Sequence, residues 1–317
     1  MNSSKVTAAR SSIRDYVRIA RVDHWFKNVF MIPGAAVALV LTQVDVSRAI
    51  WPFLLGFAST CLVASANYVI NEWLDAEFDR HHPLKKGRPS AAGRVEGRYV
   101  LLEYLLLLSV GLAIASFISK EFLIFSIALL VMGILYNVRP MRTKDIAYLD
   151  VLSESINNPL RFLLGWATIA SGLLPPSSIL LAYWMGGAYL MAIKRYAEYR
   201  YIGDPTLAGR YRRSFQFYSE ERLLVSAFFY ALSSAFFLGI FLVKYRVEFL
   251  LSFPFFALLF AWYLSIGMQS HSPTQNPEKL YKESGFIAYL LFLATVVGLL
   301  FVIDIPWLHM LLNKTTY

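Results

Sequence analysis

The residues best suited to chemistry follow a long apolar run, in the polar stretch 67–89. Asn71, Asp75 and Asp79 recur at intervals of four residues. On a helix, side chains four apart lie along one strip, with a drift of about 40° per step. Oxygen donors in such a strip can hold a divalent cation, and Mg2+ commonly combines one or two carboxylates with phosphate oxygens and water. We therefore predict a magnesium site for a phosphate-bearing substrate, with Asp75 and Asp79 as catalytic residues and, together with Asn71, as metal ligands.

Basic side chains come directly after this acidic strip. Within fifteen residues of Asp79 the sequence has Arg80, Lys85, Lys86, Arg88 and Arg94. Lysine and arginine bind phosphate oxygens, so we assign Lys85 and Arg88 to substrate binding. The alternative is a solvated helix end whose charges have no ligand.

A second polar group lies at the start of another apolar block. Asp150 and Glu154 are four residues apart, and Asn157 and Arg161 continue the same helical strip. Polar groups on one face of a membrane helix are costly unless they meet partners or line a cavity. We predict a second metal or anion site here. The alternative is a polar lock between helices in which Arg161 neutralises Glu154.

Two further basic positions are candidates for anion binding. Lys194 and Arg195 end an apolar block, and Lys27 follows an aromatic residue near the amino terminus. Cations at the ends of membrane spans often only extend to the interface, so this alternative stays open for all three residues.

The elements that must position these residues are membrane helices. The chain of 317 residues is 57% hydrophobic and only 16% charged, whereas a soluble domain has about a quarter of its residues charged. A bilayer span needs roughly 20 apolar residues. We predict nine spans, at about 27–43, 49–71, 99–117, 121–137, 150–171, 177–197, 223–243, 248–268 and 285–305. The expected fold is an all-α membrane bundle with a polar cavity.

The order of these spans predicts three parts and an orientation. Residues 1–28 are expected to form an interfacial segment, 29–306 the transmembrane catalytic domain, and 307–317 a short outer tail. With the amino terminus in the cytoplasm, 24 of the 30 Lys and Arg residues fall on the cytoplasmic side, as the positive-inside rule requires. The polar clusters then face the cytoplasm from the inner membrane. The net charge of +9 suits lipid head groups and phosphates, and we expect no nucleic-acid partner.

These motifs resemble those of the UbiA superfamily of intramembrane prenyltransferases. Asn71, Asp75 and Asp79 are similar to its aspartate-rich signature, in which Glu72 takes the place of an aspartate and would be a further metal ligand. Tyr136 and Lys144, followed by Asp150 and Glu154, are similar to its second motif. The resemblance implies Mg2+ as cofactor, Asp150 as an additional ligand, and Tyr136 and Lys144 at the substrate site. We also predict Asp150 and Glu154 as catalytic residues and Arg142 as a substrate-binding residue, although residues 139–143 depart from the family pattern.

Within this superfamily, three stretches resemble the decaprenyl-phosphate phosphoribosyltransferases. They are Arg21–Asn28, His82–Pro89 and Lys194–Glu198, the last of which contains Arg195 and Tyr196. The resemblance implies transfer of a phosphoribosyl group from phosphoribosyl diphosphate to a polyprenyl phosphate. Lys27, Lys194, Arg195 and Tyr196 would then contact the phosphates of either substrate.

Two other functions remain open from the sequence. The first is transfer of a prenyl group from a prenyl diphosphate to an aromatic or other acceptor, which would use the same metal chemistry. The second is transport coupled to intramembrane acids, which would place the acids near the bilayer midplane. The acids cluster at the ends of spans instead, which argues against transport.

Overall fold

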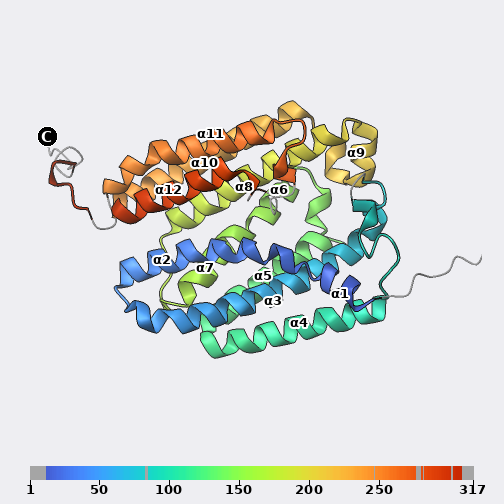
Figure 1. The fold of residues 1–317 in the computed structure, drawn as a ribbon, viewed down its shortest axis with the longest axis horizontal. Coiled ribbons are helices and arrows are strands. Elements are labelled where there is room, and N and C mark those ends of the chain that lie inside the picture. The colour runs from blue at the N-terminus through green and yellow to red at the C-terminus, as the bar shows by residue number, and fades with distance from the viewer. Residues whose placement is uncertain are drawn as a thin grey trace, which may run out of the picture. The chain divides into compact units, whose positions relative to one another are not determined.

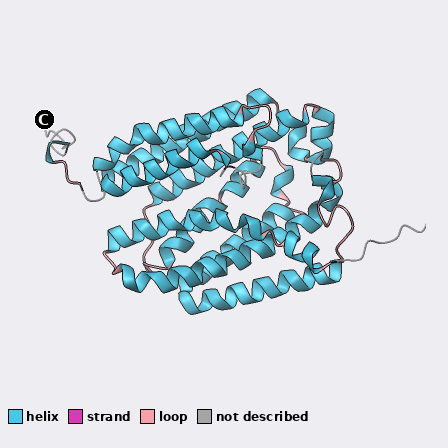
Figure 2. Cartoon of the chain, in the orientation of Figure 1, coloured by secondary structure: helices cyan, strands magenta, loops and turns pink. Residues whose placement is uncertain are grey.

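The computed structural model describes residues 12–82, 85–245, 247–275, 280, 282–300 and 303–308. Every regular element in these residues is helical, which confirms the prediction of an all-α fold (Figure 2). The start of the predicted interfacial segment and most of the predicted outer tail lie outside the described residues.

The described residues form two compact units. Unit 1 contains the residues up to Pro175 together with Ile202–Tyr218. Its α-helices, labelled in Figure 1, are α1 (Ile13–Ile19), α2 (Met31–Thr42), α3 (Val46–Asp79), α4 (Gly97–Ile118), α5 (Lys120–Asn137), α6 (Leu149–Ser155), α7 (Asn157–Ala167) and α9 (Pro205–Tyr211). Short 3-10 helices join them: η1 (Val22–Phe30), η2 (Lys85–Gly87), η3 (Thr143–Asp145) and η4 (Arg213–Gln216).

Unit 2 contains Pro176–Tyr201 and the residues from Ser219 onward. Its elements are α8 (Ser177–Ile202), whose last residue falls in unit 1, then α10 (Glu220–Tyr245), η5 (Val247–Ser252), α11 (Phe253–Gly267), η6 (Pro273–Gln275) and α12 (Ser284–Leu300). Several of these helices carry large exposed apolar side chains, among them Phe228, Phe236 and Leu291.

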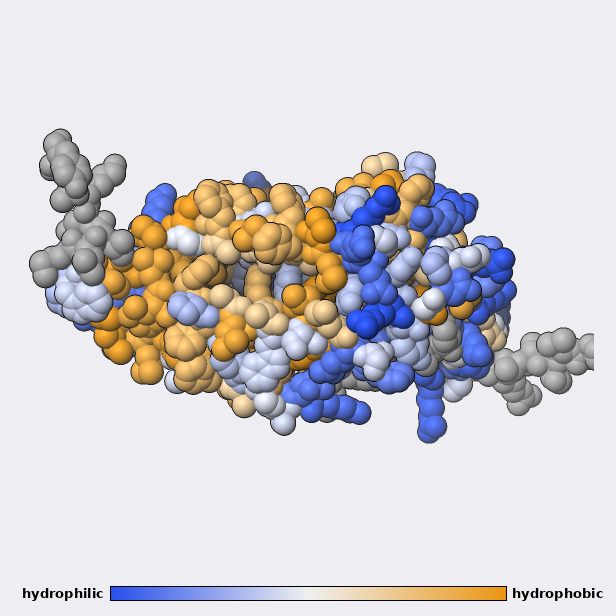
Figure 3. Space-filling model, turned by 90° about the horizontal axis from the view of Figure 1, so that it is seen from above, coloured by the Kyte–Doolittle hydropathy of each residue, from blue (hydrophilic) through white to orange (hydrophobic). Residues whose placement is uncertain are grey.

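Six helical segments in the described residues are long and apolar enough to cross a bilayer. They are Ile13–Thr42, Val46–Asp79, Gly97–Ile118, Lys120–Asn137, Glu220–Tyr245 and Val247–Gly267. Figure 3 shows one face on which a broad apolar area gives way to hydrophilic side chains at one end. The chain is therefore a multi-pass membrane protein, while the count of nine spans is not confirmed.

Close backbone packing fixes the frame of unit 1. A Cβ atom added at Gly34 of α2 would lie 2.0 Å from the carbonyl oxygen of Phe162, and one at Gly165 of α7 would lie 1.9 Å from that of Met31. Small residues allow membrane helices to approach in this way. Helix α7 also packs against α5, and α5 packs against α3. The close contact between α2 and α7 therefore belongs to the same packed group of helices as α3.

The predicted acidic strip lies on one continuous helix. Helix α3 begins after Asp45, whose side chain accepts a hydrogen bond from the Ser47 amide at 2.9 Å, and such a cap stabilises a helix start. It ends at Asp79, four residues before Pro83 in the sequence. The strip therefore occupies the last turns of α3.

The second predicted strip is divided between two helices. Asp150 and Glu154 lie on α6, whereas Asn157 and Arg161 lie on α7. Pro159 has no amide hydrogen to donate to the carbonyl group four residues earlier, which weakens a helix at this point. The predicted strip therefore extends over two consecutive helices instead of one.

Candidate active site

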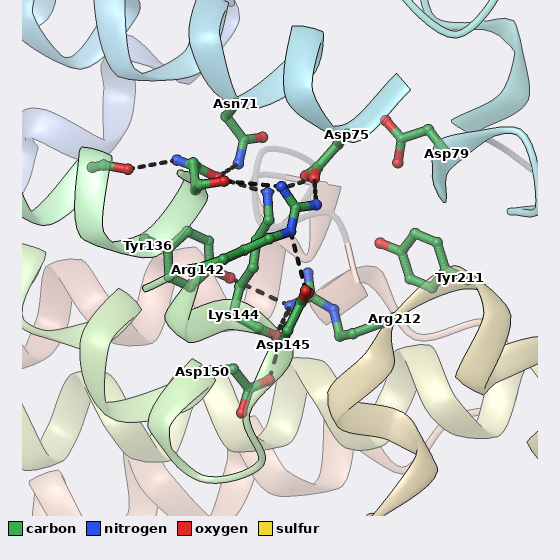
Figure 4. A network of polar contacts seen from close by, with 12 residues as sticks. Asn71, Asp75, Asp79, Tyr136, Arg142, Lys144, Asp145, Asp150, Tyr211 and Arg212 are labelled. Carbon is green, nitrogen blue, oxygen red and sulfur yellow. Dashed lines mark hydrogen bonds and ion pairs between the residues drawn. The ribbon is translucent and has the colours of Figure 1, made fainter. Parts of the chain in front are cut away.

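A small pocket lies where the end of α3 meets two loops of unit 1. Its volume is about 20 Å3, which is room for little more than a water molecule. It is lined by Asp75, Phe78 and Asp79 of α3, by Arg142, Lys144 and Asp145 of the loop around η3, and by Tyr211 and Arg212 at the end of α9. Figure 4 shows most of these side chains converging.

Asp75 is held by two cations from the loop after α5. Arg142 Nη2 donates to Asp75 Oδ1 at 2.8 Å, and Lys144 Nζ donates to the same oxygen. Both cationic side chains are buried. Burial of a charge is costly unless an opposite charge pairs with it. Asp75 and these two cations therefore form one ion-paired group.

Asparagine side chains continue this network along α3 and α5. Asn71 Nδ2 donates to Asn137 Oδ1, and Lys144 Nζ donates to that oxygen at 2.8 Å. Arg142 Nη1 donates to the Asn137 carbonyl oxygen at 2.9 Å. The bond through Nδ2 leaves the Oδ1 atom of Asn71 as its potential metal-binding atom.

Arg142 has an unusual backbone conformation. Its φ angle is 32°, in the left-handed region that non-glycine residues seldom adopt. Its guanidinium also donates from Nε to Asp145 Oδ2 at 3.2 Å. Residues in such conformations persist where their surroundings fix them and are frequent at functional sites. The bonds to Asp75, Asn137 and Asp145 supply that constraint.

Burial changes the acidity of the lysine in this group. Lys144 is 3% exposed, and desolvation lowers its pKa to about 8, against the opposing effect of the Asp75 charge. Removal of a cation from water favours its neutral form. Lys144 is therefore placed where an additional anion would stabilise its charged form.

The other end of the acidic strip has its own basic partners. Arg88 Nη1 donates to Asp79 Oδ2 at 2.7 Å. Lys85 Nζ donates to the Tyr211 hydroxyl and lies 4.6 Å from the centre of that ring. Arg88 therefore lies at the acidic end of α3 and Lys85 lies against Tyr211 of the pocket wall, and their role in substrate binding stays a prediction.

Glu72 lies on a different side of α3. It is buried and accepts a hydrogen bond from Arg21 Nη2 at 3.1 Å. It does not line the described pocket. Adjacent residues on a helix point about 100° apart, which separates Glu72 from Asn71, and the structure does not place it with the other predicted ligands.

Asp150 also lies apart from the strip on α3. It is fully buried and accepts hydrogen bonds from Tyr218 Oη at 2.7 Å and Ser214 Oγ at 3.1 Å. Arg212 Nη1 is 3.8 Å from its carboxylate. Figure 4 shows Arg142, Lys144 and Arg212 between Asp150 and the row formed by Asn71, Asp75 and Asp79. Because basic groups fill this space, the structure does not bring the two predicted acidic groups together.

Tyr136 contacts two members of this intervening group of basic residues. Its hydroxyl accepts a hydrogen bond from Arg212 Nη1 at 3.4 Å, and Lys144 Nζ lies 5.7 Å from its ring centre. Glu154 is half-buried on α6, one turn beyond Asp150.

Lys27, Asn157 and Arg161 lie outside the pocket residues. Lys27 Nζ is 3.2 Å from His24 Nδ1 and 5.8 Å from the Tyr68 ring centre. The buried Arg161 donates from Nε to Asn28 Oδ1 at 2.9 Å and from Nη1 to the Asn157 carbonyl oxygen at 3.3 Å. Arg161 therefore connects α7 to η1 through its hydrogen bond to Asn28.

Lys194, Arg195 and Tyr196 belong to α8 in unit 2. Arg195 Nη1 donates to Glu198 Oε2 at 3.3 Å, and both side chains are buried. The Tyr196 hydroxyl accepts a hydrogen bond from Arg200 Nη1 at 3.0 Å. The role of these residues toward a substrate stays a prediction.

The sequence pattern missed four residues that line the pocket: Phe78, Asp145, Tyr211 and Arg212. Tyr211 and Arg212 lie in a basic run, Arg210–Arg213, more than 60 residues after η3. Such a run indicates anion binding in general, but it does not indicate which distant segment it will meet.

The donor atoms of the pocket suit a hard divalent cation. Asp75 and Asp79 offer carboxylate oxygens and Asn71 offers an amide oxygen, the donor types that Mg2+ prefers. The described residues contain no group of three His, Cys, Asp or Glu side chains that could hold a metal. In this conformation Arg142 and Lys144 bond to Oδ1 of Asp75, and Arg88 bonds to Oδ2 of Asp79, so a metal bound here would share these carboxylates with the cations or displace them.

The fold and the pocket together define a class of protein. An all-helical membrane protein carries, at the polar end of one helix, carboxylates and cations suited to a metal and a phosphate-bearing ligand. The profile of the UbiA prenyltransferase family matches residues 30–296. The chain therefore belongs to the UbiA prenyltransferase family, and the family predicted from its motifs is confirmed.

Named relatives differ in the activity that their names state. The chain is 29% identical to Nodulation protein NoeC of Azorhizobium caulinodans, over 65% of this chain and 66% of the relative. It is 29% identical to the decaprenyl-phosphate phosphoribosyltransferase of Mycolicibacterium smegmatis, over 68% and 65% respectively. It is 26% identical to the protoheme IX farnesyltransferase of Alkalihalophilus pseudofirmus, over 65% and 67%. The chain spans 28%, 66% and 54% of the length of three curated relatives that it matches.

Solved structures agree with the fold. A UbiA homolog from Archaeoglobus fulgidus bound to GPP and Mg2+ superposes with a TM-score of 0.66, covering 89% of this chain and 99% of that chain at 21% identity. At this level of identity the likeness shows the fold alone.

Proposed function

We propose that this protein transfers a 5-phosphoribosyl group from phosphoribosyl diphosphate to a polyprenyl phosphate and releases diphosphate. The reaction would depend on Mg2+ and take place at the cytoplasmic side of the inner membrane. The observation that carries this proposal is the cation-rich pocket at the end of α3, where Arg142, Lys144 and Arg212 lie beside Asp75 and Asp79.

The excess of positive charge favours a substrate with several phosphate groups. Five basic side chains, Lys85, Arg88, Arg142, Lys144 and Arg212, contact or line this pocket. A prenyl diphosphate has one charged end, whereas phosphoribosyl diphosphate has two and the lipid acceptor adds a third anion. The similarity to the Mycolicibacterium smegmatis enzyme supports the same choice.

The residues of the chain would act by holding and orienting anions. A bound divalent cation supplies charge that stabilises the departing diphosphate. Arg142 and Lys144, once released from Asp75, can donate to phosphate oxygens, and Arg88 can do so from the other side of the pocket. Charged donors placed before the reaction stabilise charge that develops in the transition state.

The proposed bond changes need no proton transfer from the protein. The bond between C1 of the ribose and the diphosphate oxygen breaks, and the diphosphate leaves with the electron pair. An oxygen of the lipid phosphate, which is already anionic, forms the new bond to C1. The protein therefore needs no general base, which agrees with a pocket built from cations and metal-binding acids.

A specific observation also favours a second candidate, transfer of a prenyl group from a prenyl diphosphate. The family and the similarity to the farnesyltransferase support it, and the Archaeoglobus fulgidus homolog was solved with GPP and Mg2+. Its metal and diphosphate chemistry would use the same pocket.

The two candidates can be separated with purified protein in lipid. Labelled phosphoribosyl diphosphate with a polyprenyl phosphate, and labelled prenyl diphosphate with 4-hydroxybenzoate, are supplied in parallel with and without Mg2+. We expect Mg2+-dependent lipid labelling in the first reaction and none in the second. Label from the prenyl donor alone would replace the first proposal by the second.

A further inference from the structure

A second, larger cavity lies next to the pocket in unit 1. It is open to the surface, with a volume of about 320 Å3, and its walls combine the charged residues Arg139, Arg142, Asp145 and Arg213 with Pro140, Met141 and Ile146. Arg139 and Arg213 are exposed. Arg142 and Asp145 also line the small pocket. Their ion pair, 3.2 Å from Arg142 Nε to Asp145 Oδ2, therefore belongs to the walls of both spaces, which we call the inner pocket and the outer cavity.

The outer cavity carries an excess of positive charge. The carboxylate of Asp145 is already paired with Arg142, whereas no carboxylate in the described part of the chain lies within ion-pairing distance of Arg139 or Arg213. Three guanidinium groups around one paired acid favour an anionic ligand, because arginine presents a planar set of donors that matches phosphate oxygens.

An aromatic ring links the two cavities. Phe78 of α3 lines the inner pocket, and its ring centre is 4.9 Å from the Arg142 guanidinium carbon and 5.9 Å from that of Arg213. Guanidinium groups at such distances are attracted to the ring face. Phe78 therefore contacts one arginine shared by the two cavities and one arginine of the outer cavity.

The size of the outer cavity limits what it can hold. Ligand pockets typically measure about 300–1,000 Å3, so 320 Å3 suits a small phosphorylated group.

We propose that the outer cavity is a binding site for a phosphomonoester, held by Arg139 and Arg213 with Arg142 at its inner edge. This inference rests on the proposed function, in which the phosphomonoester is the 5-phosphate of phosphoribosyl diphosphate and the diphosphate is held by the cations at the end of α3. The two anionic ends of one donor would then meet two adjacent groups of basic side chains. A prenyl diphosphate has no second anionic end and would leave Arg139 and Arg213 without a ligand.

The test uses the double variant R139Q/R213Q, with R98Q/R210Q as the matched control. Arg98 and Arg210 are exposed arginines of unit 1 that line neither cavity, so the control removes equal charge. In steady-state transfer assays we expect R139Q/R213Q to raise the KM for phosphoribosyl diphosphate by about ten-fold or more, the loss expected for charge-assisted bonds. The KM for polyprenyl phosphate should stay within about two-fold of the wild-type value. The control variant should have the same KM values as the wild type.

Direct binding separates this inference from the proposed function. Ribose 5-phosphate is titrated into the detergent-purified full chain, and inorganic diphosphate with Mg2+ is titrated separately. We expect R139Q/R213Q to lose ribose 5-phosphate binding and to keep diphosphate binding. If the wild type shows no phosphoribosyl transfer but this pattern holds, the proposed function fails and the phosphomonoester site stands.

Three outcomes would overturn the inference. The first is active wild-type protein whose KM for phosphoribosyl diphosphate is unchanged in R139Q/R213Q. The second is a raised KM for polyprenyl phosphate alone, which would assign the cavity to the phosphate of the lipid. The third is an equal loss of ribose 5-phosphate binding in R98Q/R210Q. That result would show that binding depends on the total surface charge and not on Arg139 and Arg213.

Discussion

Lys144 donates a hydrogen bond to Asp75, and this contact joins the loop after α5 to the last turns of α3. Asp75 and Lys144 lie 69 residues apart in the chain. Arg142 donates to the same carboxylate oxygen. The negative charge of Asp75, the middle residue of the predicted metal-binding strip, is therefore balanced by two cationic side chains of the protein. These ion pairs hold the loop against α3. A metal could replace the cations at Asp75, and an anionic substrate could replace Asp75 as the partner of Arg142 and Lys144.

Replacement of Asp75 by Asn should affect both turnover and stability. We expect at least about a 100-fold loss of transfer activity, because a metal-binding carboxylate is removed. We also expect a loss of about 1–3 kcal/mol in the free energy of unfolding, because Arg142 and Lys144 are buried and lose their charged partner. Transfer assays and thermal unfolding in detergent measure the two effects.

The double variant D75N/K144M separates these two effects. Removal of the buried ammonium together with its partner should recover part of the stability, since no unpaired charge of Lys144 remains. Activity should stay lost. Recovery of transfer in the double variant would show that Asp75 serves only to compensate Lys144.

Removal of divalent metal should abolish transfer in the wild type. We expect chelation to stop the reaction and added Mg2+ to restore it. Mg2+ should also raise the melting temperature of the substrate-free protein, because a ligand that binds the folded state stabilises it. This thermal shift should be absent in D75N, and a shift of equal size in D75N would place the metal elsewhere.

Replacement of Asp150 by Asn tests the second acidic group. In the structure its carboxylate accepts hydrogen bonds from Ser214 and Tyr218, so we expect a loss of about 1–3 kcal/mol in stability. The Mg2+ concentration for half-maximal activity should not change. A several-fold increase in that concentration would instead support the metal-ligand role predicted from the sequence.

Replacement of Gly165 by Leu should weaken the contact between α2 and α7. The added side chain would enter the space of the Met31 carbonyl oxygen, and overpacking of this kind costs about 1–3 kcal/mol or more. Gly239→Ala is the control, because a Cβ at Gly239 meets nothing within 4 Å. Thermal unfolding should show a clear decrease for Gly165→Leu and little change for Gly239→Ala.

Spacing along single helices predicted part of the site well. Asn71, Asp75 and Asp79 share a strip of α3 because helical geometry alone fixes side chains four residues apart. The predicted strip from Asp150 to Arg161, in contrast, is divided between α6 and α7. Pro159 was the available signal of that break.

The amino-acid sequence by itself determined the membrane-embedded helical class, the family and the acidic strip on α3. These features depend on composition and on short repeats, which act within one element. The tertiary structure alone decided that Arg142, Lys144 and Arg212 stand between Asp75 and Asp150, and that Arg139 and Arg213 share a cavity. Such contacts join segments separated by about 70 residues, and their geometry depends on how loops and helices pack, which local periodicity does not specify.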